Sequence, residues 1–85
     1  LRIVGLEAGS LLRPAPGQTQ MRVNLQAIGA QDGLTWLLNG QVVGHSEQAD
    51  KPLRLSLAQG GAQALTAMDG RGRYAQLRFT VQVSN

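Results

Sequence analysis

The sequence predicts an all-β fold, a small antiparallel β-sandwich of about seven short strands. Short runs in which apolar and polar residues alternate recur along the chain, as they do in half-buried strands. Turns rich in Gly, Pro, Asn and Asp separate these runs roughly every 8–12 residues, which is typical of sandwiches. No stretch combines the length and the periodicity of a helix. A closed barrel is the alternative that the same pattern allows.

The first part of the chain is expected to form two strands with an edge segment between them. Leu1–Leu6 is apolar and rich in β-branched residues, and a turn follows it. Leu11–Arg13 is expected to be a short edge piece that ends before Pro14–Gln18, because proline cannot donate to a β-ladder. Gln20–Ile28 is expected to be a half-buried antiparallel strand, with one face formed by Met21, Val23, Leu25 and Ala27.

The central stretch Leu34–Gly44 is expected to be a β-hairpin. Leu34, Trp36 and Leu38 share one apolar face of its first strand. Asn39-Gly40 predicts a type I′ turn, because both central residues need a positive φ that Asn tolerates and Gly adopts freely. Gln41–Val43 returns the chain, and the polar segment His45–Pro52 is expected to be a loop.

The last part of the chain is expected to supply three more strands. Leu53–Leu57 alternates, and Gly60-Gly61 then forms a turn. Ala62–Asp69 has a composition that suits helix or strand, and its short length between two Gly-rich turns favours strand. A tight connection through Asp69-Gly70 leads to the final strand from Tyr74, in which Ala75, Leu77, Phe79, Val81 and Val83 point one way.

Trp36 is expected to be the residue around which the core packs. It shares a face with Leu34 and Leu38, which favours burial over the alternative of an exposed ring that stacks on a sugar. Its position on the third main strand matches the core tryptophan of immunoglobulin-like sandwiches, without the flanking cysteines of antibody domains. The predicted core comprises Leu34, Trp36, Leu38, Leu65, Leu77 and Phe79.

Length and charge limit the classes of partner. Eighty-five residues make one domain (1–85), which we expect to be part of a longer protein, and no stretch suits contact with a membrane. The net charge is +3, with the basic residues spread along the chain. A solvated surface explains this balance, and weak attraction to an anionic polymer or an acidic partner is the alternative. Nucleic acid is not an expected partner, because three aromatic residues are too few for base stacking.

Residue types that carry catalysis are not combined in this sequence. No serine is followed three residues later by a lysine, the spacing with which a lysine amine can activate a serine nucleophile. The five acidic residues fall in predicted turns or loops, and His45 has no cysteine to join it in a metal site. We therefore expect no catalytic, cofactor-binding or metal-binding residue. Asp69 is interpreted as a turn residue that accepts backbone N–H groups at Gly70, the alternative being a cation ligand helped by Asp50.

Two segments together resemble a known family. Trp36–Gly40 followed by Val43-Gly44 resembles a signature of tryptophan, Asp/Asn-Gly and a short return strand, and Gly60–Arg73 resembles one of Gly, Leu-Thr, Asp and Gly-Arg. With Leu77–Val81, they resemble the C-terminal domain of bifunctional penicillin-binding proteins of the 1C type. Around Ile3, the proline that family members often carry is missing.

The resemblance implies a non-catalytic module from a periplasmic peptidoglycan synthase that is anchored in the inner membrane. The catalytic residues of such proteins lie in glycosyltransferase and transpeptidase domains, so none transfers to this chain. The module would dock on the adjacent transpeptidase domain or on another periplasmic protein. A peptidoglycan-binding module and a passive spacer are the alternatives. Tyr74 faces away from Leu77 and Phe79, and with Arg71 and Arg73 it is the predicted interaction surface, since Tyr and Arg are enriched at interfaces.

Overall fold

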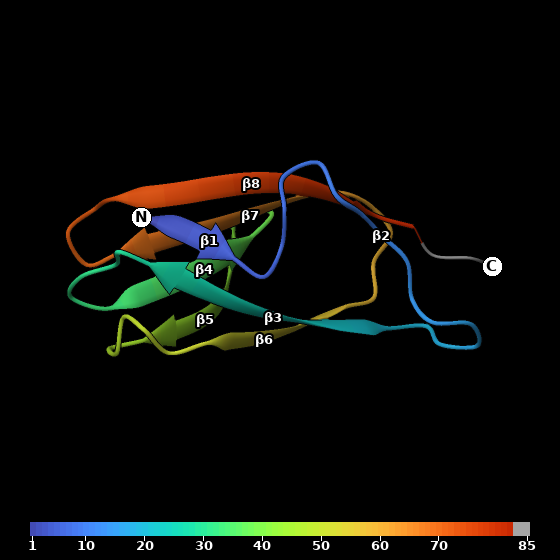
Figure 1. The fold of residues 1–85 in the computed structure, drawn as a ribbon, viewed down its shortest axis with the longest axis horizontal. Coiled ribbons are helices and arrows are strands. Elements are labelled where there is room, and N and C mark those ends of the chain that lie inside the picture. Colours follow the sequence, from blue (N-terminus) through green and yellow to red (C-terminus); the bar gives the residue numbers. More distant parts are fainter. Residues whose placement is uncertain (83–85) are drawn as a thin grey trace.

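The computed structural model describes residues 1–82 and contains eight β-strands (Figure 1). The described residues include no helix, so none that could span a membrane. The strands are β1 (Arg2–Val4), β2 (Leu11–Leu12), β3 (Met21–Ile28), β4 (Leu34–Leu38), β5 (Gln41–Ser46), β6 (Leu53–Leu57), β7 (Gly61–Asp69) and β8 (Tyr74–Val81).

The strands form two sheets that pack face to face, so the predicted all-β sandwich is confirmed. One sheet has three strands in the order β1-β3-β6, and the other has five in the order β2-β8-β7-β4-β5. All neighbours are antiparallel except β2, which runs parallel to the last strand β8. The chain therefore crosses between the layers after β1, after β2, after β3, after β5 and after β6.

Several strand boundaries differ from those that the sequence predicts. The first strand covers only Arg2–Val4, because Gly5 adopts a φ of 101° and turns the chain. The return strand of the central hairpin extends to Ser46, so His45 lies in a strand and not in the predicted loop. Ala62–Asp69 is a strand, as predicted from its length. Val83, expected to point inward, lies outside the described residues.

The core lies between the two sheets and includes the single tryptophan. Trp36 is 2% exposed and Leu65 is fully buried. Leu34 and Phe79 are also buried, while Leu38 and Leu77 are partly buried and pack against this cluster. The three-stranded sheet contributes Ile3, Leu25, Ala27, Leu55 and Leu57 from its inner face. Burial of these apolar side chains is the main stabilising contribution in a chain without disulfides.

The central hairpin turns at Asn39 and Gly40, whose φ angles of 53° and 84° match the predicted type I′ turn. Asn39 also ties this turn to the neighbouring strand, because its Oδ1 accepts a hydrogen bond from the backbone N–H of Ala64 at 2.8 Å. The hairpin is thereby fixed against β7, and β4 is an inner strand of the sheet, between the edge strand β5 and the central strand β7.

Candidate interaction surface

The outer face of the five-stranded sheet carries a row of side chains across four strands. Tyr74 on β8 lies opposite Met68 on β7, Met68 lies opposite Thr35 on β4, and Thr35 lies opposite His45 on β5. Thr35 Oγ1 and His45 Nδ1 are 2.9 Å apart and share a hydrogen bond. Tyr74 is 66% exposed, so its ring is available at one end of the row.

A second row lies beside the first and is more apolar at its β5 end. Gln76, Thr66, Leu37 and Val42 oppose one another in turn across β8, β7, β4 and β5. Val42 is 65% exposed, and Val43 is the extra residue where the pairing of β4 and β5 shifts register. We call the two rows with Val43 the outer sheet face. Four of the six large apolar side chains that are exposed in residues 1–82 lie on it, which is typical of interaction surfaces.

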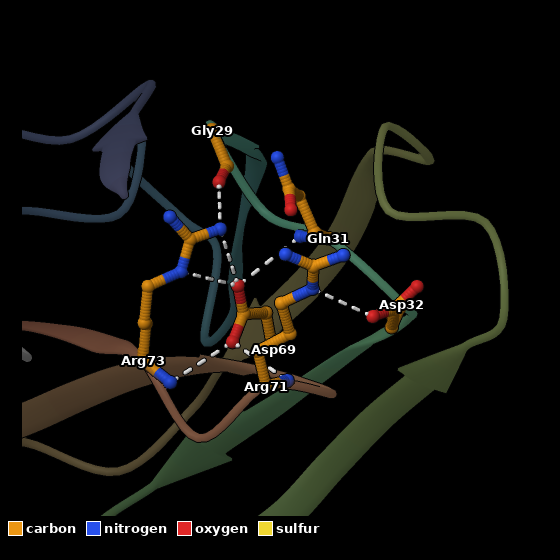
Figure 2. Close-up of polar contacts among 6 residues, drawn as sticks. All are labelled: Gly29, Gln31, Asp32, Asp69, Arg71 and Arg73. Atoms are coloured by element: carbon orange, nitrogen blue, oxygen red, sulfur yellow. Dashed lines mark hydrogen bonds and ion pairs between the residues drawn. The ribbon is translucent and has the colours of Figure 1, made fainter.

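The sheet ends at a buried carboxylate, Asp69, the last residue of β7. Its Oδ1 accepts hydrogen bonds from the backbone N–H groups of Arg71 and Arg73 at 3.1 and 2.9 Å. Its Oδ2 accepts from the backbone N–H of Gln31 at 3.1 Å and from Nε of Arg73 at 3.0 Å (Figure 2). The Arg73 guanidinium also donates to the carbonyl of Gly29 at 2.9 Å. These five residues, the Asp69 cluster, join the loop after β3 to the turn before β8.

The protonation of Asp69 is set by two opposing effects. Burial raises the pKa of a carboxyl group, because it removes water from the charged form. The hydrogen bonds from Gln31, Arg73 and Arg71 outweigh burial and hold the pKa of Asp69 below its ordinary value of 3.8. Asp69 is therefore ionised at neutral pH, and its charge is balanced by Arg73.

A second ion pair links the same two loops at the surface. Nε of Arg71 lies 2.8 Å from Oδ2 of Asp32, and the hydrogen bond with Asp32 raises the pKa of the guanidinium. Both side chains are more than half exposed, so water screens this pair and its contribution to stability is small. Gly70 lies between the loops, and its N–H donates to the carbonyl of Gln31 at 3.0 Å.

The structure places the three residues of the predicted surface in different settings. Tyr74 is exposed on the outer sheet face, whereas Arg71 and Arg73 are engaged by Asp32 and Asp69. Both arginines therefore hold the loops together at the end of the sheet (Figure 2).

The interpretation of Asp69 as a turn residue accounts for only half of the hydrogen bonds that its carboxylate accepts. The bonds to the turn N–H groups agree with it, but the bond from Gln31 crosses from another loop. Both carboxylate oxygens accept hydrogen bonds from protein donors. Residues 1–82 contain no group of three or more His, Cys, Asp or Glu side chains that could hold a metal ion.

Sequence reasoning missed most of the outer sheet face. Thr35 and His45 lie on the two strands of the central hairpin, whereas Met68 lies on β7, which only the sheet order brings beside β4. The sequence predicts that Val42 lies in the return strand of the central hairpin. Its exposure follows from the edge position of β5, which the sequence does not specify.

Residues 1–79 match the model of the Penicillin-Binding Protein C-terminus Family. The chain belongs to this family. Penicillin-binding protein 1C of Escherichia coli (strain K12) is 27% identical over 82 residues, which cover 96% of this chain and 10% of that protein. The chain thus spans about a tenth of the length of this relative, and the resemblance noted in the sequence is confirmed.

The fold has a counterpart among solved structures. A fibronectin(III)-like module of Clostridium thermocellum CbhA superposes with a TM-score of 0.62 over 98% of this chain and 96% of the module. The identity is 12%, so this likeness concerns the fold alone. It agrees with the two-sheet, immunoglobulin-like sandwich that the present chain adopts.

Proposed function

We propose that the chain is a non-catalytic accessory module of a periplasmic peptidoglycan synthase, and that it docks on another protein through the outer sheet face. The observation that carries the docking proposal is the exposed apolar set on that face, with Tyr74 at one end and Val42 at the other. The partner is the adjacent transpeptidase domain or another periplasmic protein. Membership of the penicillin-binding protein C-terminus family supports this setting, in which the parent is anchored in the inner membrane.

The composition of the outer sheet face suits a protein partner. Tyr and Met are enriched at protein interfaces, and binding energy concentrates in such anchors when they become fully buried. Thr35, Thr66 and Gln76 supply hydroxyl and amide groups between the apolar ones, and Gln76 Nε2 already donates to Thr66 Oγ1 at 3.0 Å. An exposed face that mixes apolar and polar side chains in this way is suited to covering by another domain.

Site-specific photo-crosslinking in the full-length parent protein tests this proposal. A photoreactive residue replaces Tyr74 on the outer sheet face, and a matched control replaces Arg22 on the opposite face of the sandwich. We expect crosslinks to the transpeptidase domain or to a second envelope protein from position 74 and none from position 22. Equal yields from both positions, or none from position 74, would contradict docking through this face.

Glycan recognition by Tyr74 is the second candidate, and the exposed ring is the observation that favours it. A sugar-stacking site usually needs a second ring, and Trp36 and Phe79, the other aromatic residues, are buried. If Tyr74→Ala leaves binding to peptidoglycan sacculi unchanged, stacking at Tyr74 is wrong. The passive spacer predicts that removing the domain alters neither the stability nor the activity of the parent enzyme.

A further inference from the structure

The strands of one face of the sandwich carry three arginines and no acidic residue. Arg2, Arg22 and Arg54 are exposed on the outer face of the sheet β1-β3-β6, where they alternate with inward residues such as Ile3 and Leu55. The chain has eight Lys and Arg and five Asp and Glu. The three strands of this sheet contain no acidic residue, and outside them the basic and acidic residues are equal in number.

Two of the three arginines are close neighbours. Arg22 on β3 lies opposite Ser56 on β6, and Arg54 on β6 lies opposite Asn24 on β3. This register makes Arg22 and Arg54 diagonal neighbours, a relation that places their Cβ atoms about 7–8 Å apart. Ser56 and Asn24 add a hydroxyl and an amide between them. We call these four residues with Arg2 the arginine face.

Acidic residues border this face without neutralising it. The Asp50 carbonyl accepts a hydrogen bond from Gln26 Nε2 at 3.2 Å, which places the β5–β6 loop at the border, but Lys51 follows Asp50 in that loop. Glu7 follows β1 and lines the same hollow as Arg2. The two ion pairs among residues 1–82 involve Asp32 and Asp69, and neither includes an arginine of this face. Like charges at short range repel, so an anion that bridges them stabilises the arrangement.

The chemistry of the arginine face selects the kind of anion. It offers no ring for base stacking, because Trp36 and Phe79 are buried and Tyr74 is on the other sheet. Among residues 1–82, its one large exposed apolar side chain is Ile28, which lies opposite Arg2 and at the other end of β3 from Arg22. Guanidinium, amide and hydroxyl groups spread over a sheet suit a hydrated polymer with repeated carboxylates, which arginine binds by paired N–H donors.

We propose that the arginine face binds the carboxylates of peptidoglycan, so that the module contacts the polymer on one side and a protein on the other. The choice of this polymer rests on the proposed function, which places the chain beside peptidoglycan. The surface and its chemistry differ from sugar stacking at Tyr74, since the arginine face recognises charge and lies on the opposite sheet.

Co-sedimentation of the 85-residue chain with purified sacculi tests the proposal. Native sacculi are compared with sacculi whose carboxylates have been converted to neutral amides. The test variant is Arg22→Gln/Arg54→Gln. The matched control Arg13→Gln/Arg78→Gln removes the same charge from other parts of the surface. Thermal unfolding of each variant checks that it remains folded. Vesicles of phosphatidylglycerol and phosphatidylethanolamine provide an anionic surface without glycan.

We expect the test variant to bind native sacculi about thirtyfold more weakly than the unchanged chain, and the control variant to bind nearly as well. Amidated sacculi should lose binding for all forms. Equal losses in the two variants, undiminished binding to amidated sacculi, or equal binding to the vesicles would each overturn the proposal. Crosslinking from position 74 reports on the other sheet, so its outcome separates failure here from failure of the proposed docking.

Discussion

Replacing Gly70 by alanine should push the turn before β8 away from the loop after β3, because the structure leaves no room for the added methyl group. A Cβ built at this position would lie 1.8 Å from the backbone oxygen of Asp32 and 2.8 Å from its carbonyl carbon. The φ of Gly70 is not positive, so the backbone itself would accept alanine. The obstacle is therefore steric contact with backbone atoms, which cannot rotate away as the end of a side chain can.

The size of the effect follows from the contacts that must break. An ordinary contact needs the loops to separate by about 1.5 Å. That movement breaks the hydrogen bond from Gly70 N–H to the Gln31 carbonyl and the one from Gln31 N–H to Asp69. At about 1 kcal/mol for each bond, Gly70→Ala should lower the free energy of unfolding by roughly 2–3 kcal/mol. For a domain of this size, that corresponds to a fall in Tm of about 10–15 °C.

The assay is thermal unfolding followed by circular dichroism, with urea unfolding as a second measure of stability. Gly72→Ala is the matched control in the same turn, because its Cβ would meet nothing within 4 Å while its φ of 83° is strained for alanine. Gly72→Ala should lower the free energy of unfolding by about 1 kcal/mol, through backbone strain alone. If Gly70→Ala is no less stable than Gly72→Ala, steric contact between the two loops does not determine stability, and the reasoning is refuted.

Four further predictions concern the buried carboxylate, the core and the strand β5. Asp69→Asn should destabilise the chain more than Asp32→Asn, because only Asp69 is buried and bonded to several donors. The folded-state pKa of Asp69 is lowered, so its contribution to stability is fully present above the unfolded value near 3.8 and is lost as pH falls through the folded pKa. Urea unfolding at pH 7, 5 and 3 should therefore show a loss for the unchanged chain below about pH 4, and a smaller one for Asp69→Asn. Leu65→Ala, at a fully buried position, should cost about 2–5 kcal/mol in urea unfolding, and a cost below 1 kcal/mol would contradict tight packing there. Gly44→Ala should lower the free energy of unfolding by less than about 1 kcal/mol in urea, because the added Cβ would meet the flexible end of the Leu53 side chain at 2.7 Å. A larger loss would mean that the Leu53 side chain cannot move aside.

Local signals in the sequence were strong enough to predict the strands. The alternation in Met21–Ile28 and Tyr74–Val81 predicts their strand character because successive side chains must point to opposite faces. Asn39-Gly40 predicts its turn because few other pairs adopt two positive φ angles. The end of β5 was missed, since His45 and Ser46 are polar and extend the strand by pairing with Thr35 and Leu34.

The candidate surfaces depend on pairing between segments that are distant in the chain. The exposed ring of Tyr74 follows from alternation in one strand, so the sequence could predict it. The arginine face needs β3 to pair with β6, which brings together Arg22 and Arg54 across more than thirty positions. The Asp69 cluster needs the loop after β3 to meet the turn before β8, and no local pattern reports that contact.

The sequence by itself determined the all-β class, the main strands, the central turn and the inward position of Trp36, because each depends on the backbone preference or side-chain alternation of neighbouring residues. Only the tertiary structure decided the sheet order, the partners of Asp69 and which residues gather on the outer sheet face and on the arginine face. The physical reason is that strand pairing joins residues through backbone hydrogen bonds that are alike along every strand. The choice among possible partners is therefore made by the packing of the whole core.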